Sequence, residues 1–205
     1  MKKKTENRKR LEAIYEINQG FLGLIVQRAH QCMDQFGLQA DLCRKIAALS
    51  PSQRDVVATV PVLLVTVARR AIAQAKAVRD MEDVDCRTYQ RIEVEAQNFA
   101  AALMTWLTQD AQQNHSLASL WLGVRGFDGE PIRSYSFGEI QTLAPHADTI
   151  LKARFRNRPK VWSDLIRGAG SKDPRSRQLA RLAVLPHSFP LRLWMRFGPR
   201  RKRRR

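Results

Sequence analysis

Two stretches of regularly spaced apolar residues constrain this chain more than any other feature. Between residues 11 and 29, apolar side chains recur three and four positions apart, which places them on one face of an α-helix. Residues 92–107 repeat this spacing and include aromatic side chains. We therefore predict long amphipathic helices over about 7–35 and about 86–112, and an all-α fold.

A helix start signal follows each of these long helices. Ser50 can cap free amides, Pro51 needs no amide partner in the first turn, and Gln53 can reach back to the serine. Ser136 and Glu139 have the same spacing as Ser50 and Gln53. Each pair predicts a capping box and a helix that begins next to the serine.

The two boxes indicate an internal repeat. They lie 86 residues apart, and at that offset Ala58 aligns with Ala144. Each half is predicted to contain a long helix, a short helix (residues 40–48 and 116–122) and a capping box. We therefore predict a tandem duplication of one helical unit.

Residues 60–67 allow two structures. Their β-branched side chains favour a strand, whereas Pro61 could open a buried helix. Because predicted helices flank the stretch on both sides, we predict a helix. The apolar run is far shorter than the roughly 20 residues that a membrane span needs, and the charged N-terminus lacks the apolar core of a secretory signal.

Basic residues are concentrated toward the C-terminus. Residues 151–205 hold 18 of the 36 lysines and arginines but only Asp164 and Asp173 of the 19 acids, so this part carries +16 of the net +17. Such asymmetry predicts a polyanionic partner, and we favour nucleic acid over a solvated tail. A membrane surface stays open as an alternative, because residues 189–197 place Trp194 among arginines and apolar residues.

The basic part also predicts local structure. Val161, Trp162, Leu165 and Ile166 form the apolar face of a short helix, residues 168–172 a linker and residues 174–185 a further helix, with disorder past Pro186. Trp162 is expected in the core rather than stacked on a base. The predicted DNA contacts are Arg154, Arg156, Arg158, Lys160, Arg167, Lys172, Arg175, Arg177, Arg181, Arg200, Arg201, Lys202, Arg203, Arg204 and Arg205.

Catalytic and metal-binding patterns are not found in the sequence. The cysteines and histidines are scattered, and the glycine-rich residues 123–129 lack the phosphate-loop pattern. Ser136 lies near His146 and Asp148 in sequence, but it has a capping role and no nucleophile elbow surrounds it. We predict no enzyme, no cofactor and no metal site. The cysteines are Cys32, Cys43 and Cys86, all expected to be reduced, and the histidines are His30, His115, His146 and His187.

Several motifs resemble the FlhD family of flagellar master regulators. Residues 11–18 read Leu-Glu-Ala-Ile-Tyr-Glu-Ile-Asn, and Gly37-Leu38 is followed by Ile-Ala-Ala-Leu-Ser-Pro-Ser-Gln over 46–53. The resemblance covers roughly residues 11–70. The second half resembles the family more weakly, at Asn98, Gln109-Asp110, Leu143-Ala144 and Arg154-Phe155.

The resemblance implies a mostly helical subunit that forms dimers and activates transcription at promoter DNA. Such a subunit works with an FlhC-like partner, which holds the zinc of that complex, and recruits RNA polymerase. This chain departs from the pattern in its length, its basic tail and Val65, which stands where the family has a dimer-linking cysteine. A fused pair would form either a homodimer or an intramolecular pseudo-dimer, and it would serve flagella or a mobile element.

These observations together give one functional hypothesis. We expect an FlhD-like domain over 1–80, a second repeat over 81–168 and a basic helix and tail over 169–205. The expected function is a transcription activator subunit that binds duplex DNA in the bacterial cytoplasm without inserting into a membrane. The alternatives are a protein–protein adaptor or anti-activator, and an RNA-binding protein that uses the basic tail.

Overall fold

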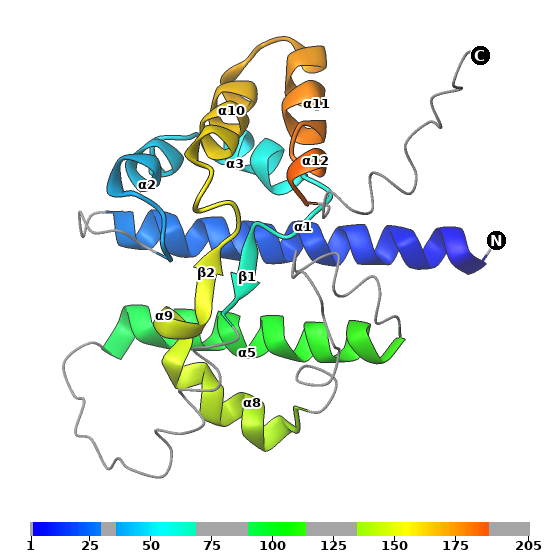
Figure 1. Ribbon diagram of the computed structural model, residues 1–205, viewed down its shortest axis with the longest axis vertical. Helices are drawn as coiled ribbons and strands as arrows, with labels where there is room; N and C mark the ends of the chain where they lie inside the picture. Colours follow the sequence, from blue (N-terminus) through cyan, green and yellow to red (C-terminus); the bar gives the residue numbers. More distant parts are fainter. Residues whose placement is uncertain (1, 30–35, 69–89, 114–134, 189–205) are drawn as a thin grey trace, which may run out of the picture.

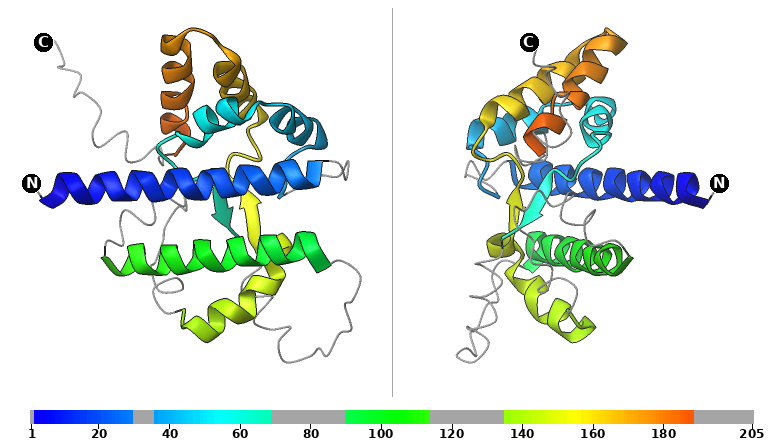
Figure 2. Two further views of the ribbon diagram at one scale, coloured as in Figure 1. Left: turned by 180° about the vertical axis from the view of Figure 1, so that it is seen from behind. Right: turned by 45° about the vertical axis from the view of Figure 1, so that its right-hand side comes forward.

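Two long helices lie side by side in the computed structural model, which describes residues 2–29, 36–68, 90–113 and 135–188. They are α1 (Lys2–Arg28) and α5 (Gln90–Gln113), and they run antiparallel (Figures 1 and 2). The Arg10 Nε lies 2.8 Å from an Asp110 oxygen, and the rings of Phe21 and Phe99 lie 6.2 Å apart. Both predicted long helices are confirmed, although α1 begins five residues earlier than expected.

Both predicted capping boxes are present. Gln53 N donates to Ser50 Oγ at 3.3 Å and Ser50 N donates to Gln53 Oε1 at 2.9 Å, at the start of α3 (Pro51–Ala58). Glu139 N and Ser136 N make the same exchange at 3.3 Å and 2.8 Å, at the start of α8 (Phe137–Leu143). The short helix α2 (Ala40–Ala47) also lies where the sequence predicts it.

The remaining elements follow α8. They are the 3-10 helix η2 (Ala144–His146), α9 (Ala147–Ile150), β2 (Leu151–Ala153), α10 (Pro159–Gly170), α11 (Pro174–Leu182) and α12 (Leu185–Ser188). The predicted boundary at 168 falls inside α10. Pro186, expected to begin a disordered tail, lies inside α12.

The prediction of a helix over residues 60–67 is wrong. Val65–Val67 form β1, which pairs antiparallel with β2. The β-branched side chains of this stretch suit a pleated strand, and β2 supplies the backbone partners that the strand needs. The described residues are therefore mostly helical, in agreement with the predicted all-α class, and they add one small two-stranded sheet.

The strand pairing is symmetric. Thr66 pairs with Lys152, which lies 86 residues further on, the same separation as between the capping boxes. Ala68 N donates to Ile150 O at 2.8 Å, and Arg154 N donates to Leu64 O at 2.7 Å. Position 68 plus 86 is position 154, and position 150 minus 86 is position 64. The 86-residue offset therefore maps the first bond onto the second. The two halves thus meet about the Thr66–Lys152 pair.

The elements form two groups on either side of the sheet. Helices α2, α3, α10, α11 and α12 lie with α1, whereas α8 and α9 lie with α5 (Figures 1 and 2). One continuous core joins both groups, since Phe21, Leu64, Leu103 and Ile150 are all buried in it. The symmetric pairing and the shared core make the two halves a single packed unit.

Several sequence predictions fall on the core or outside the described residues. Cys43 is a buried free cysteine, as expected. Cys32, Cys86, and residues 116–122 and 123–129 lie outside the described residues. Among the described helices, none has the length and apolar character to cross a membrane.

Asn18 connects α1 to the segment between α3 and β1. It is fully buried, its amide donates to Ala58 O at 3.1 Å and to Val62 O at 2.9 Å, and Leu64 N donates to its Oδ1 at 2.8 Å. One side chain therefore satisfies two carbonyls and one amide that α3 and β1 leave unpaired. Buried backbone groups without partners are costly, so Asn18 fixes the path of the chain into β1.

We expect Asn18→Ala to lower the free energy of unfolding by about 3 kcal/mol, because three buried backbone groups lose their partner. Denaturant titration followed by circular dichroism measures this. The matched control is Gln19→Ala, since Gln19 is exposed and bonds Tyr15 Oη and Asp55 Oδ1. Its loss should stay below about 1 kcal/mol. Equal losses in the two variants would contradict the role given to Asn18.

Candidate nucleic-acid interface

Helices α10 and α11 form a closely packed pair joined by the three residues 171–173. A Cβ atom added at Gly168 would lie 2.2 Å from the Ala180 Cβ, so only glycine allows α11 to approach α10 this closely. Val161, Trp162 and Leu165 of α10 are buried in the core. Helix α10 packs on α2 and α3, and it thereby fixes α11 to the body of the protein (Figure 2).

Helix α11 begins at a strong N-cap and remains on the surface. The Asp173 carboxylate accepts from Arg175 N at 3.1 Å, Ser176 N at 2.9 Å and Ser176 Oγ at 2.6 Å. The hydrogen bond from Ser176 is the main reason that the pKa of Asp173 lies below its ordinary value. No residue of α11 is buried, so the helix lies on the surface, packed against α10 (Figure 1).

The exposed side of α11 combines polar and apolar side chains. Arg175 and Gln178 are exposed and lie three residues apart, on neighbouring turns of the same face. Leu179 and Leu182 are 61% and 46% exposed, so they add apolar surface to this side of the helix. Sequence reasoning missed Gln178, because it selected residues by positive charge alone.

The structure separates the described basic residues into those that are free to meet a partner and those that hold α11 in place. Lys172 and Arg175 are exposed, whereas Arg167 pairs with Asp164. Arg177 Nε donates to Ser171 O at 2.6 Å, and Arg181 Nη2 donates to Thr59 O at 3.0 Å. These last two arginines therefore fasten α11 to the turn and to the end of α3.

Arg154 is a correction to the predicted contacts. It is 5% exposed, and its guanidinium donates to Leu63 O at 3.4 Å and to Ser188 O at 3.3 Å. Burial lowers its pKa to about 10, so it keeps its charge at neutral pH among carbonyl dipoles. A side chain buried in this way cannot reach a phosphate. Trp162 donates to Arg154 O at 2.8 Å and is fully buried, which confirms its predicted core position.

The other predicted arginines and lysines form a second group. Arg156, Arg158 and Lys160 are exposed at the N-terminal end of α10, with Arg156 lying against Gly37. The twelve residues of α10 separate this group from Lys172 and Arg175 by about 18 Å. The contacts predicted at Arg200, Arg201, Lys202, Arg203, Arg204 and Arg205 lie outside the described residues.

Two helices joined by a three-residue turn can place the second helix in the major groove of DNA. In such motifs the N-terminal residues of the second helix contact base edges, and basic residues nearby bind phosphates. Arg175 and Gln178 occupy these positions on α11, and Lys172 lies in the turn.

In the described part of the chain, no group of three or more histidine, cysteine, aspartate or glutamate residues is placed to hold a metal.

We expect Arg154→Lys to destabilise the fold by about 2 kcal/mol, because a lysine ammonium cannot span carbonyls on two segments as the planar guanidinium does. Thermal and denaturant unfolding measure this loss. Arg156→Lys, two residues along and exposed, is the control and should change stability by less than about 0.5 kcal/mol. A destabilisation by Arg154→Lys no greater than that of the control would show that the buried bonds do not stabilise the fold.

Comparisons with known protein families, with curated proteins and with solved structures found no match for this chain. The resemblance to the FlhD family therefore rests on the sequence motifs of residues 11–18 and 46–53.

Proposed function

We propose that this protein is an FlhD-like transcription regulator, duplicated within one chain, that binds duplex DNA through α11. One observation carries the proposal: α11 follows α10 after a three-residue turn, is held by close packing at Gly168, and presents Arg175 and Gln178 to solvent. Arginine pairs with guanine and glutamine with adenine through two hydrogen bonds each, so both side chains suit base recognition.

The charge distribution supports a DNA partner. The +16 charge of residues 151–205 gives this C-terminal part of the chain, which contains α11, a strong attraction for phosphates. Residues 1–150 carry only +1, so this attraction also orients the protein toward DNA. A protein with uniformly spread charge would lack that orientation.

The symmetric pairing of β1 with β2 supports a pseudo-dimer. In a duplicated chain, the two copies can meet as two separate subunits of a dimer would, through the same surface of each. The proposed regulator would then occupy its own dimer interface and act in the bacterial cytoplasm, in a flagellar or mobile-element system. An FlhC-like subunit and RNA polymerase are its proposed protein partners.

Specific DNA binding is tested by gel shift with duplex fragments from the protein's own locus, at about 150 mM salt with excess scrambled competitor. We expect one fragment to be retained. Arg175→Ala should weaken binding to that fragment by roughly 5- to 150-fold while changing non-specific binding little, because base contacts specify the sequence. Lys172→Ala should weaken binding to all duplexes alike.

Arg8→Ala is the control for charge removal, since Arg8 is exposed on α1, is paired with Glu12 and lies in the other half of the chain. It should leave the retained fragment bound. If the scrambled competitor displaces every fragment, α11 does not read a sequence. Displacement by structured RNA instead of duplex DNA would favour the RNA-binding alternative.

If the two copies pair within one chain, the protein should be a monomer in solution. Sedimentation equilibrium of the full chain should give a mass near 23.5 kDa at micromolar concentration. A mass twice as large would mean that β1–β2 pairing within the chain does not replace association between chains. The homodimer alternative would then hold.

A second candidate function, a protein–protein adaptor, is favoured by the exposed leucines of α11. Leu179 and Leu182 form an apolar surface on a helix whose polar residues suit DNA. Leu179→Ser with Leu182→Ser separates the two functions, because it removes apolar contact area and keeps Arg175 and Gln178. Unchanged DNA retention by this variant supports DNA recognition through the polar residues.

A further inference from the structure

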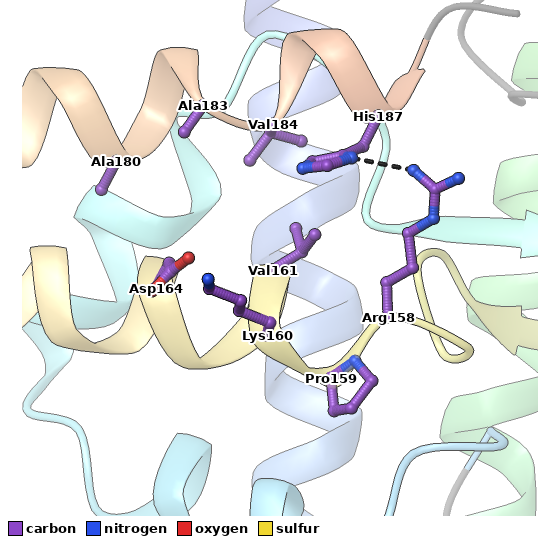
Figure 3. Close-up of a pocket in the computed structure, with 9 residues that line it drawn as sticks. All are labelled: Arg158, Pro159, Lys160, Val161, Asp164, Ala180, Ala183, Val184 and His187. Carbon is purple, nitrogen blue, oxygen red and sulfur yellow. Dashed lines mark hydrogen bonds between the residues drawn. The ribbon is translucent and has the colours of Figure 1, made fainter.

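A cleft of about 480 Å³ lies between α10 on one side and the end of α11 with α12 on the other (Figure 3). Its size is within the range of small-molecule binding sites in proteins. None of the proposed base contacts of α11 lines it, so the DNA-binding proposal leaves the cleft without a role.

Aliphatic side chains form the walls of the cleft. Val161 of α10 and Val184, between α11 and α12, face each other across it and are 6% and 1% exposed. Ala180 and Ala183 line the α11 side. Because the two valines are almost entirely covered by protein, the apolar surface open to a hydrocarbon chain includes Ala180 and the exposed Ala183.

One end of the cleft is closed by hydrogen-bond donors. An Arg158 Nη lies 2.8 Å from His187 Nδ1, and since arginine only donates, the histidine nitrogen accepts and its ring proton is on Nε2 (Figure 3). The remaining guanidinium N–H groups and the His187 Nε2–H are donors. Lys160 also lines the cleft, and its ammonium extends toward Asp164, away from Arg158 (Figure 3).

The charges around the cleft favour an anion. Asp164 is its acidic lining residue, and Asp164 already accepts from Arg167. Arg158 and Lys160 remain as the lining cations. An uncharged ligand that contacted only the aliphatic walls would not use the attraction of these two cations. A cationic ligand would be repelled by them.

We propose that this cleft binds a small amphipathic anion, with a carboxylate head at Arg158 and His187 and a short aliphatic body against Ala180 and Ala183. A carboxylate oxygen accepts from the planar guanidinium in a charge-assisted bond, and the histidine Nε2–H supplies a second donor. The hydrocarbon then replaces water along the alanine side of the cleft.

The chemistry of the cleft disfavours other occupants. A nucleic-acid backbone has phosphates but no aliphatic body for the apolar walls. Residues 189–197 include apolar residues, but their charged residues, Arg192 and Arg196, are cationic and have the same sign as Arg158 and Lys160. A small anion satisfies both the apolar walls and the donors.

The position of the cleft links the ligand to α11. Since its two walls belong to α10 and to the end of α11 with α12, a ligand between them would change how α11 lies on α10. This consequence rests on the proposed function, because only a DNA-binding α11 makes such a change a regulatory one. Binding of the anion itself does not depend on it.

The probe for the test is octanoate, at concentrations far below those at which it forms micelles. We expect ¹H–¹⁵N spectra of the full chain to shift at residues that line the cleft, with a dissociation constant of about 1 mM or tighter, as suits a ligand of this size. Octanol, which lacks the charge, should bind at least about 10-fold more weakly. Octylammonium should not shift these residues.

Two variants locate the site. Ala183→Phe introduces a ring from an exposed position on the wall, and it should abolish the shifts without entering the core. Arg158→Gln should weaken octanoate binding by about 10-fold and leave octanol binding unchanged. Arg156→Gln is the matched control, because Arg156 is exposed two residues away and does not line the cleft. It should bind octanoate like the parent chain.

Three results would overturn the proposal. Equal shifts with octanol and octanoate would mean that the donors do not recognise the head group. Shifts spread over α1 and α5, or unaffected by Ala183→Phe, would mean that octanoate binds elsewhere. Binding of an acidic leucine-rich peptide at the cleft without binding of octanoate would identify a peptide groove instead.

A gel shift with and without octanoate separates this inference from the DNA-binding proposal. If the spectra show octanoate in the cleft and the retained fragment binds with changed affinity, the cleft regulates α11. If no fragment is retained even without octanoate, DNA recognition fails while the ligand site stands. If a fragment is retained but the spectra show no octanoate, the ligand site fails alone.

Discussion

The antiparallel pairing of β1 with β2 is the contact on which the rest of this structure depends. The register matches Thr66 with Lys152, and the bonds from Ala68 to Ile150 and from Arg154 to Leu64 extend the pairing on both sides. A two-stranded ribbon is marginal alone, so it needs the helices that pack around it. Here α1 and α5 lie on either side of it, and the core they form is shared by both halves.

The accuracy of the sequence predictions follows the range of the interactions involved. Capping boxes at Ser50 and Ser136 depend on residues three positions apart, so the sequence predicts them, and both are present in the structure. The β1 strand depends on a partner more than eighty residues away, and its local pattern fits a helix as well. Once Lys152 and its neighbours supply backbone partners, the β-branched residues of β1 favour the strand.

In the candidate site, the charge of a residue alone does not predict whether it can contact a partner. The number of lysines and arginines marks residues 151–205 as basic, but it does not distinguish Arg154 from Lys172. Only the packed structure shows that Arg154 donates to carbonyls of two distant segments while Lys172 is exposed in a turn. Gln178 was missed for the converse reason, because an uncharged side chain gains importance only from its place on the exposed face of α11.

Helix α10 connects the two sites proposed for this protein. Its buried side, including Trp162 and Leu165, fixes it to the core, so it cannot shift easily. Helix α11 has no buried residue and touches α10 closely at Gly168 and Ala180, near one end of the pair. The cleft begins at Ala180 and extends along the residues that follow it, so a ligand beside Arg158 would press on this end of α11, and α11 would turn about its contact with Gly168. The rigid partner would stay in place, and the helix proposed to read DNA would move.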